Sequence, residues 1–97
     1  MSLQVVYTPS AKGTLLAVYN FIHERYGQTI ADEFINKAEH TISLIREQPY
    51  IFRVSLIATD VRVAFISKQT SLFYQIKEDT LILLFFWDNR QEPLVQE

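Results

Sequence analysis

A run of seven apolar residues near the carboxyl end constrains the fold of this chain more than any other feature. Leu81 to Trp87 contains no polar or charged side chain apart from the indole of its last residue, and it is much shorter than the ~20 residues that a membrane-spanning helix needs. A short run that is apolar at every position is typical of a central strand covered on both faces. We therefore expect a sheet that holds Leu81 to Trp87 in its interior, and no membrane span.

The first half of the chain predicts two amphipathic helices. Thr8 and Pro9 have the residue types of an N-cap and a first helical position, and Gly27 has that of a C-cap. A second helix is predicted from a capping-box pattern that begins at Thr29, and it ends before Pro49. In both, apolar residues recur every three or four positions, which is the helical period. The two apolar stripes are Leu15, Tyr19, Ile22 and Tyr26, and then Ile30, Phe34, Ala38, Ile42 and Ile45.

Strand signals occupy the rest of the chain. Gln4 to Tyr7 reads as a first strand, and the second half has four strand-like segments separated by turns of hairpin length. These four are Phe52 to Ile57, Val61 to Phe65, Leu72 to Ile76, and Leu81 to Trp87. The order predicts an α+β fold, β-α-α-β-β-β(-β), in which a helix hairpin packs on one face of an antiparallel sheet. Residues 1–97 are expected to form a single domain.

The last strand raises the question of what covers the second face of the sheet. With strict alternation, Leu81, Leu83, Phe85 and Trp87 point to one face, and Ile82, Leu84 and Phe86 point to the other. Two helices cover only one face, so either a partner or curvature of the sheet must cover the other. An uncovered row of such side chains would favour association by several kcal/mol at roughly 25 cal/mol per Å². We expect the free protein to self-associate through this strand.

Composition excludes several kinds of site. The chain has no cysteine, which rules out thiolate zinc sites, a thiol nucleophile and disulfides. His23 and His40 fall on separate predicted helices without a neighbouring carboxylate pair, so we expect neither a metal nor a cofactor. The formal net charge is −2 and the pI about 5.6, the wrong sign for a domain that binds nucleic acid mainly through phosphates. A cytoplasmic location is expected.

Three stretches resemble a known family once the order of elements is taken into account. They are Val6-Tyr7-Thr8-Pro9-Ser10-Ala11, the segment Phe73 to Leu84, and the ending Trp87-Asp88-Asn89-Arg90-Gln91-Glu92-Pro93. Together they resemble the RelE/ParE toxin superfamily, also called plasmid stabilization proteins, over nearly the whole chain. The resemblance implies a toxin of a type II toxin–antitoxin module that a cognate antitoxin neutralises. It also implies one of two actions: cleavage of messenger RNA on the ribosome in the RelE branch, or poisoning of DNA gyrase in the ParE branch.

The cations of this chain favour the ParE branch. RNA cleavage without a metal needs a proton acceptor, cations to stabilise the phosphate and a proton donor. Weak catalytic candidates are Arg53, Arg62 and Arg90, with Tyr74 or water to move protons. The lysines expected after the second helix are missing, and an apolar residue stands just before Tyr74, where RelE-like nucleases usually carry an arginine. With Lys68, the three arginines would form a modest basic patch on the open face of the sheet.

We therefore expect a protein that acts by binding and is not an enzyme. The residues expected to contact a partner are Arg62, Leu83, Phe85, Trp87 and Arg90. The partners expected are a cognate antitoxin and a target such as DNA gyrase. Two alternatives remain open: a ribosome-dependent mRNA endoribonuclease, and a binding module with the toxin fold but no toxicity.

Overall fold

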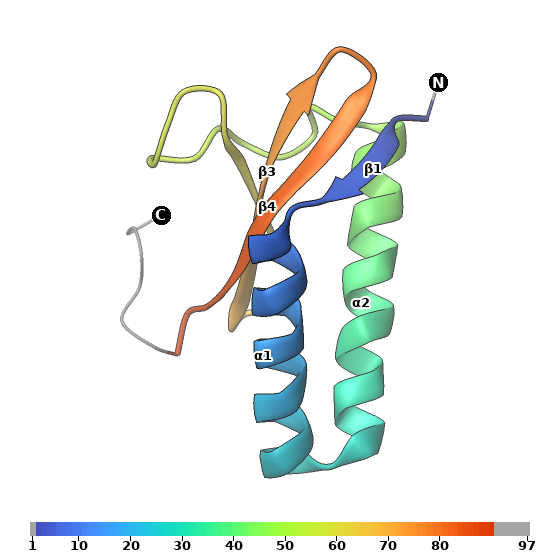
Figure 1. Cartoon of the computed structure of the whole chain (residues 1–97), viewed down its shortest axis with the longest axis vertical. Helices are drawn as coiled ribbons and strands as arrows, with labels where there is room; N and C mark the ends of the chain where they lie inside the picture. The colour runs from blue at the N-terminus through green and yellow to red at the C-terminus, as the bar shows by residue number, and fades with distance from the viewer. Residues whose placement is uncertain (1, 91–97) are drawn as a thin grey trace.

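The computed structural model describes residues 2–90, which form a helix hairpin packed on one face of a four-stranded sheet (Figure 1). In chain order the elements are β1 (Gln4–Tyr7), α1 (Pro9–Tyr26), α2 (Gln28–Glu47), β2 (Arg62–Phe65), β3 (Thr70–Lys77) and β4 (Thr80–Asp88). The predicted α+β class and the single-face helix hairpin are confirmed. Within residues 2–90, no helix is long and apolar enough to cross a membrane.

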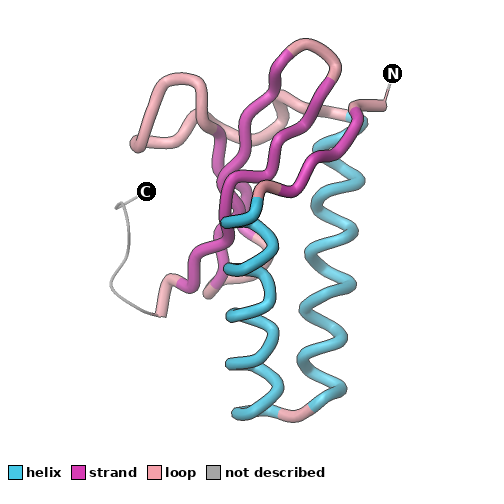
Figure 2. Tube along the Cα trace, in the orientation of Figure 1, coloured by secondary structure: helices cyan, strands magenta, loops and turns pink. Residues whose placement is uncertain are grey.

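The sheet has the strand order β1-β4-β3-β2, which puts β4 between two neighbours (Figure 2). This confirms the central position predicted for the apolar run. β2, β3 and β4 form an antiparallel meander, but β1 pairs with β4 in parallel, with Val5 opposite Leu81. The sheet is therefore mixed and not wholly antiparallel. Parallel strands need a long connection. The helix hairpin and the strands β2 and β3, which lie between β1 and β4 in the chain, supply it.

The helix boundaries follow from their caps. Thr8 is the N-cap of α1: its Oγ1 accepts a hydrogen bond from the backbone N–H of Ala11 at 3.0 Å. Gly27 ends α1 with a φ of 93°, which a residue with a side chain rarely adopts, and its N–H donates to the carbonyl of His23. α2 begins at Gln28, and no side chain caps it. The predicted capping box at Thr29 is therefore wrong, because the chain turns directly from one helix into the next at Gly27.

A β-bulge in β4 changes which side chains share a face. Phe73 of β3 lies opposite Phe85, but Tyr74 lies opposite Leu83, so Leu84 is the extra residue. Before the bulge Leu83 faces the helices, and after it Phe86 does; both are buried in the core between helices and sheet. The prediction that Leu83, Phe85 and Trp87 point to one face is therefore wrong. A bulge shifts the alternation by one residue.

A smaller apolar cluster lies on the second face of the sheet. Val61, Val63 and Phe73 are buried there, and Ala58, Leu84, Phe85 and Trp87 pack against them. Phe85 stacks on Phe73 with ring centroids 4.7 Å apart. β4 is paired along both edges, and Leu84, Phe85 and Trp87 stay partly exposed on this face. The self-association expected through Leu81 to Trp87 therefore remains a prediction.

The loop between α2 and β2 contains the predicted strand over Phe52 to Ile57, and that prediction is wrong as stated. Only Val54 forms a bridge, to Arg62, and the chain then bends. The hydroxyl oxygen of Ser55 accepts a hydrogen bond from the N–H of Ile57 at 2.9 Å, a local turn that competes with strand pairing. The segment therefore begins to extend the sheet at β2 and then leaves it.

Candidate functional site at the end of β4

The four cations that the sequence grouped into a basic patch lie in two separate places. Arg62 is opposite Tyr74 on β3, whereas Asp88, two residues before Arg90, is opposite Thr70. Four residues of an extended strand span about 13 Å. Arg62, beside the middle of β3, and Arg90, beyond the end of β4, are therefore separated along the sheet by about that distance.

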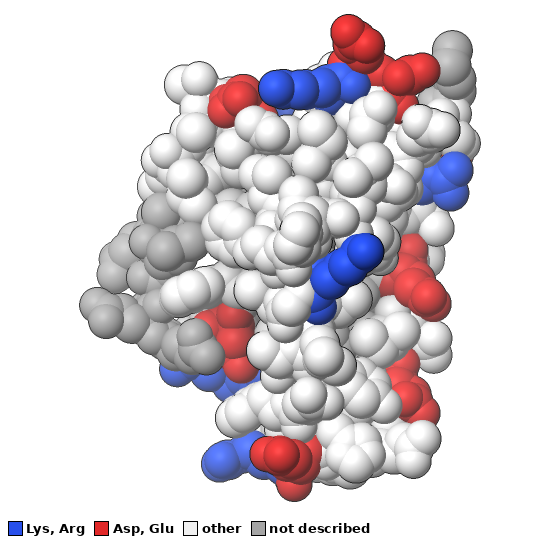
Figure 3. Space-filling view, in the orientation of Figure 1, with Lys and Arg blue, Asp and Glu red and all other residues white. Residues whose placement is uncertain are grey.

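The remaining two cations divide in the same way. Arg53 accompanies Arg62, because the N–H of Val63 donates to the carbonyl of Arg53. Lys68 lies in the β2–β3 turn, which is held to the end of β4 by a bond between the N–H of Asn89 and the carbonyl of Gln69. Figure 3 shows charged side chains mainly along the rim of one face of the molecule, with one Lys or Arg side chain near its otherwise uncharged middle.

Arg62 is bound to the loop that precedes its strand. Its Nη1 donates to the carbonyl of Phe52 at 2.7 Å, and its guanidinium lies over the ring of Tyr50, 5.0 Å from the ring centroid. The neighbouring Tyr74 is fully buried, and burial raises its pKa to about 12 although the charge of Arg62 acts in the opposite direction. Through these two contacts Arg62 binds the start of the loop between α2 and β2 to the sheet.

Arg90 forms the best-defined polar arrangement among the predicted site residues. Its Nε and Nη2 each donate to one carboxylate oxygen of Asp88 at 2.9 Å, and its backbone N–H donates to the same carboxylate. Burial alone would raise the pKa of Asp88, but the hydrogen bonds and charge of Arg90 outweigh it and hold that pKa below its ordinary value. The hydrogen bond to Asp88 in turn raises the pKa of Arg90. The guanidinium also lies 4.7 Å from the ring centroid of Phe21.

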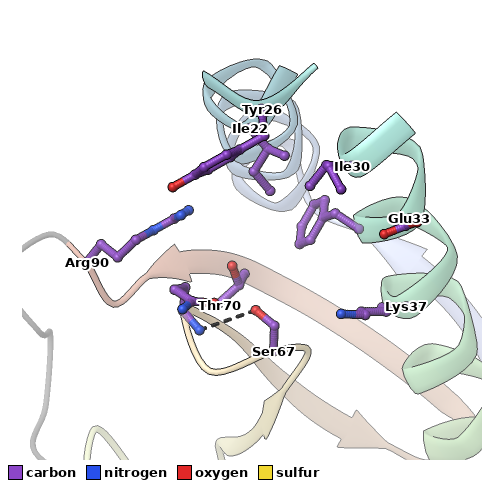
Figure 4. A pocket seen from close by; sticks show the side chains of 10 residues that line it. Ile22, Tyr26, Ile30, Glu33, Lys37, Ser67, Thr70 and Arg90 are labelled. Carbon is purple, nitrogen blue, oxygen red and sulfur yellow. Dashed lines mark hydrogen bonds between the residues drawn. The ribbon is translucent and has the colours of Figure 1, made fainter. Parts of the chain in front are cut away.

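Two cavities adjoin Arg90. The first, of about 280 Å³, opens between the end of α1, the start of α2 and the β2–β3 turn (Figure 4). It is lined by Ile22, Tyr26, Ile30, Glu33, Phe34, Lys37, Ser67, Gln69, Thr70 and Arg90. The second, of about 260 Å³, is lined by Thr14, Ala17, Val18, Phe21, Phe86, Trp87, Asp88 and Arg90. Arg90 therefore lines both cavities, the first with a mixture of polar and apolar residues and the second with mainly apolar ones.

Two buried side-chain polar atoms at this end of the sheet have no hydrogen-bond partner among the described residues. They are the hydroxyl oxygen of Thr70, a residue that lines the first cavity, and Nε1 of Trp87, a residue that lines the second. Trp87 is next to Asp88 in the chain, and Thr70 is opposite Asp88 in the sheet. Unsatisfied buried polar atoms are uncommon in folded proteins, so this end of the sheet stands out among residues 2–90.

The structure separates the predicted partner-binding residues into accessible and inaccessible ones. Arg90 and Trp87 lie together at the end of β4, and Phe85 is half-buried on the second face. Leu83 is fully buried in the core beneath the helices, so a partner cannot reach it in this fold. Arg62 is half-buried at the start of β2, beside the middle of β3.

Sequence reasoning missed the aromatic residues of α1 at this site. Tyr26 was interpreted as a core residue, but it is 53% exposed and its ring lies beside Arg90 (Figure 4). Phe21 is also exposed and lies under the Arg90 guanidinium. Phe21 falls between the core positions Val18 and Ile22 of α1, and that off-stripe position is the signal that could have found it. Within residues 2–90, no cluster of three potential metal-ligating His, Cys, Asp or Glu side chains is present.

Comparison with known proteins places the chain in a family. The family model for the ParE toxin of the type II toxin–antitoxin system parDE matches residues 5–93. The chain belongs to the ParE toxin family. No curated protein matches its sequence.

Solved structures of toxin–antitoxin proteins share the fold of this ParE family member. A chain of the chromosomal ParDE system from P. aeruginosa superimposes with a TM-score of 0.76 at 16% identity, covering 90% of this chain and 96% of that one. A chain of the YoeB dimer from Staphylococcus aureus superimposes with a TM-score of 0.62 at 12% identity, covering 90% of this chain and 97% of that one. A chain of the E. coli DinJ–YafQ toxin–antitoxin complex superimposes with a TM-score of 0.63 at 10% identity, covering 95% of this chain and 98% of that one. At such identities the likeness establishes the fold.

Proposed function

We propose that this ParE family member is neutralised by a cognate antitoxin and acts by binding a protein target, DNA gyrase, without cleaving RNA. The observation that carries the proposal is the separation of its cations. Arg62 lies beside the middle of β3 and Arg90 lies beyond the end of β4. Each is already engaged, Arg62 by Tyr50 and Phe52, and Arg90 by Asp88. A phosphodiester transition state needs cations that converge on one phosphate.

The proton-transfer group of the nuclease alternative is also poorly suited to the task. Tyr74 is fully buried and its pKa is raised to about 12. A general acid or base works best when its pKa lies near the working pH. This supports action by binding, for which the Arg90 end of β4, with Trp87 and Phe21, supplies a surface that combines aromatic rings with a held guanidinium.

The antitoxin is inferred from the family and from the structural relatives, among which are a ParDE system and the DinJ–YafQ toxin–antitoxin complex. A shallow apolar cavity of about 270 Å³ between α1 and α2 is the surface that we expect an amphipathic antitoxin segment to cover. It is lined by Tyr7, Lys12, Leu15, Leu16, Tyr19 and Ile35. A cytoplasmic location, where such targets and partners reside, is part of the proposal.

A gyrase supercoiling assay tests the proposal. Purified protein at micromolar concentration should inhibit supercoiling, and Arg90→Ala should weaken inhibition about tenfold, which corresponds to ~1.4 kcal/mol of lost binding. Arg25→Ala is the matched control, because Arg25 is an exposed arginine at the end of α1 outside both cavity linings. Unchanged supercoiling with folded protein would exclude gyrase as the target.

The two alternatives have their own readouts. Cleavage of mRNA on programmed ribosomes, mapped by toeprinting and lost in Arg90→Ala, would establish the nuclease instead. Normal growth of cells that express the protein without its antitoxin would favour a binding module without toxicity.

A further inference from the structure

The outer edge of the sheet beside β2 carries the beginning of a fifth strand. The N–H of Ser55 donates to the carbonyl of Val61 at 2.6 Å, and the N–H of Val63 donates to the carbonyl of Arg53 at 3.1 Å. Between these two bonds, Val54 lies opposite Arg62 in an antiparallel bridge. Residues 53–55 thus continue the sheet beyond β2 for one bridge only.

The pattern of these bonds fixes the direction of the Val54 backbone. When the two hydrogen bonds flank an antiparallel pair in this way, the pair itself is the non-hydrogen-bonded kind. The N–H and C=O of Val54 therefore point away from β2, toward the outside of the sheet. An outward-pointing donor and acceptor on one residue is what an added strand would pair with.

The surface around this edge is apolar and almost without charge. Between Pro49 and Thr59 the only charged residue is Arg53. Five large apolar side chains are exposed there: Tyr50 by 67%, Ile51 by 50%, Val54 by 41%, Leu56 by 68% and Ile57 by 42%. A contiguous exposed apolar surface of this kind is typical of a protein–protein interaction site.

We propose that a second copy of this chain pairs with this edge about a two-fold axis at Val54. In that arrangement the Val54 N–H of each copy donates to the Val54 carbonyl of the other, which forms the hydrogen-bonded kind of antiparallel pair. Arg53 then lies opposite Ser55 of the second copy, so no two like charges face each other. The edge is complementary to itself in register and polarity, which is what an isologous interface requires.

This location differs from the one predicted from the sequence. β4 lies in the interior of the sheet, so its backbone offers no free edge to a second copy. The loop between α2 and β2 instead exposes the unpaired edge and the apolar side chains. The inference does not depend on the proposed function, because it uses none of the residues at the Arg90 end.

Cysteine cross-linking tests the axis directly, since the chain has no cysteine of its own. In a hydrogen-bonded antiparallel pair the two Cα atoms are about 5.5 Å apart, within the range of a disulfide. Val54→Cys should therefore give a disulfide-linked dimer under mild oxidation with diamide. Leu56→Cys is the matched control, because Leu56 is exposed on the same surface. In the proposed dimer the two substituted positions would be four residues out of register, about 13 Å apart. The Leu56→Cys variant should therefore form little disulfide-linked dimer.

Sedimentation equilibrium from about 1 to 200 μM tests the affinity without oxidation. The unmodified protein should show a monomer–dimer equilibrium, and Leu56→Glu should raise its dissociation constant at least tenfold. Leu16→Glu makes the same change at an exposed leucine of α1 and should leave the constant unchanged. Circular dichroism of each variant separates loss of association from loss of fold.

Any of three results would overturn the proposal. The first is a monomer at every concentration in which Val54→Cys links no faster than Leu56→Cys. The second is a dimer that Leu16→Glu weakens as much as Leu56→Glu. The third is protection of the Val54 edge from hydrogen exchange only when a different protein is added, in which case the edge belongs to that protein. A monomer that still inhibits supercoiling would overturn this inference and leave the proposed function standing.

Discussion

The end of β4 and the start of β2 hold their arginines in different ways. At the end of β4, Arg90 binds a buried carboxylate through two side-chain hydrogen bonds, between two cavities. At the start of β2, Arg62 donates to a backbone carbonyl and lies over an aromatic ring of an exposed loop. The first is a pre-formed charged site, whereas the second holds an apolar loop against the sheet. The comparison indicates that equal charge at two positions does not give equal roles.

The largest effect should come from the core that connects both ends. Leu83→Ala removes a fully buried side chain between the helices and the sheet, and we expect the free energy of unfolding to fall by about 3 kcal/mol. Urea denaturation measures it. Leu16→Ala, an exposed leucine on α1, should change stability by no more than ~0.5 kcal/mol. Equal losses for the two variants would contradict the core assignment of Leu83.

Alkaline pH should weaken the β2 end through Tyr74. Because its pKa is raised to about 12 in the fold from an ordinary value of 10, the stabilisation is fully present below pH 10 and is lost as the pH rises through about 12. The loss should amount to about 2 kcal/mol, somewhat less than two pKa units imply at 1.36 kcal/mol each. Urea titrations at pH 9 and pH 12 of the wild type and Tyr74→Phe measure it. An identical alkaline loss in Tyr74→Phe would assign it to other groups.

Acid should weaken the β4 end through Asp88. Its pKa is lowered in the fold, so its contribution is present above the ordinary carboxyl pKa near 4 and is lost as the pH falls through the lower folded value. At pH 7, Asp88→Asn should cost about 1–2 kcal/mol, because a charge-assisted pair of hydrogen bonds is removed. The difference from wild type should shrink below pH 4 in the same titration. A difference that stayed constant down to pH 2 would contradict the assignment.

The smallest effect should come from Arg62. Arg62→Ala removes one hydrogen bond and one ring contact from a half-buried residue, which we expect to cost about 1 kcal/mol. Hydrogen exchange of residues 50–57 should become faster while that of β4 is unchanged. Arg62→Lys keeps the charge but loses the planar stacking, and it should restore only part of the protection. Faster exchange at the β4 end as well would show that the two ends are coupled.

Much of the fold could be predicted because its signals are local. The Thr8 cap, the Gly27 break and the helical stripes each depend on residues within one or two turns of each other. The apolar run of β4 likewise predicted a central strand. The parallel pairing of β1 with β4 and the bulge at Leu84 depend on which strands meet and in what register, and no local pattern encodes that.

The candidate site was only partly predictable for the same reason. Arg90 and Trp87 were identified, and the ion pair of Arg90 with Asp88 follows from their spacing of two residues. The division of the cations into two groups required the register of β2 on β3. The loop at Phe52 to Ile57 has strand-like residues, but the hydroxyl of Ser55 bends the chain after a single bridge. Phe21 and Tyr26 join the site only through the fold of α1 against β4.

The parallel pairing of β1 with β4 also bears on how the chain is made. Among the described residues β1 finds its sheet neighbour in β4, with Gln4 opposite Thr80. Contacts of such high sequence separation form slowly, since a long segment must be ordered before they are made. Until β4 has left the ribosome, β1 has no strand to pair with, and the Asp88–Arg90 pair does not yet exist. The site at the end of β4 is therefore among the last parts of residues 2–90 to form during synthesis.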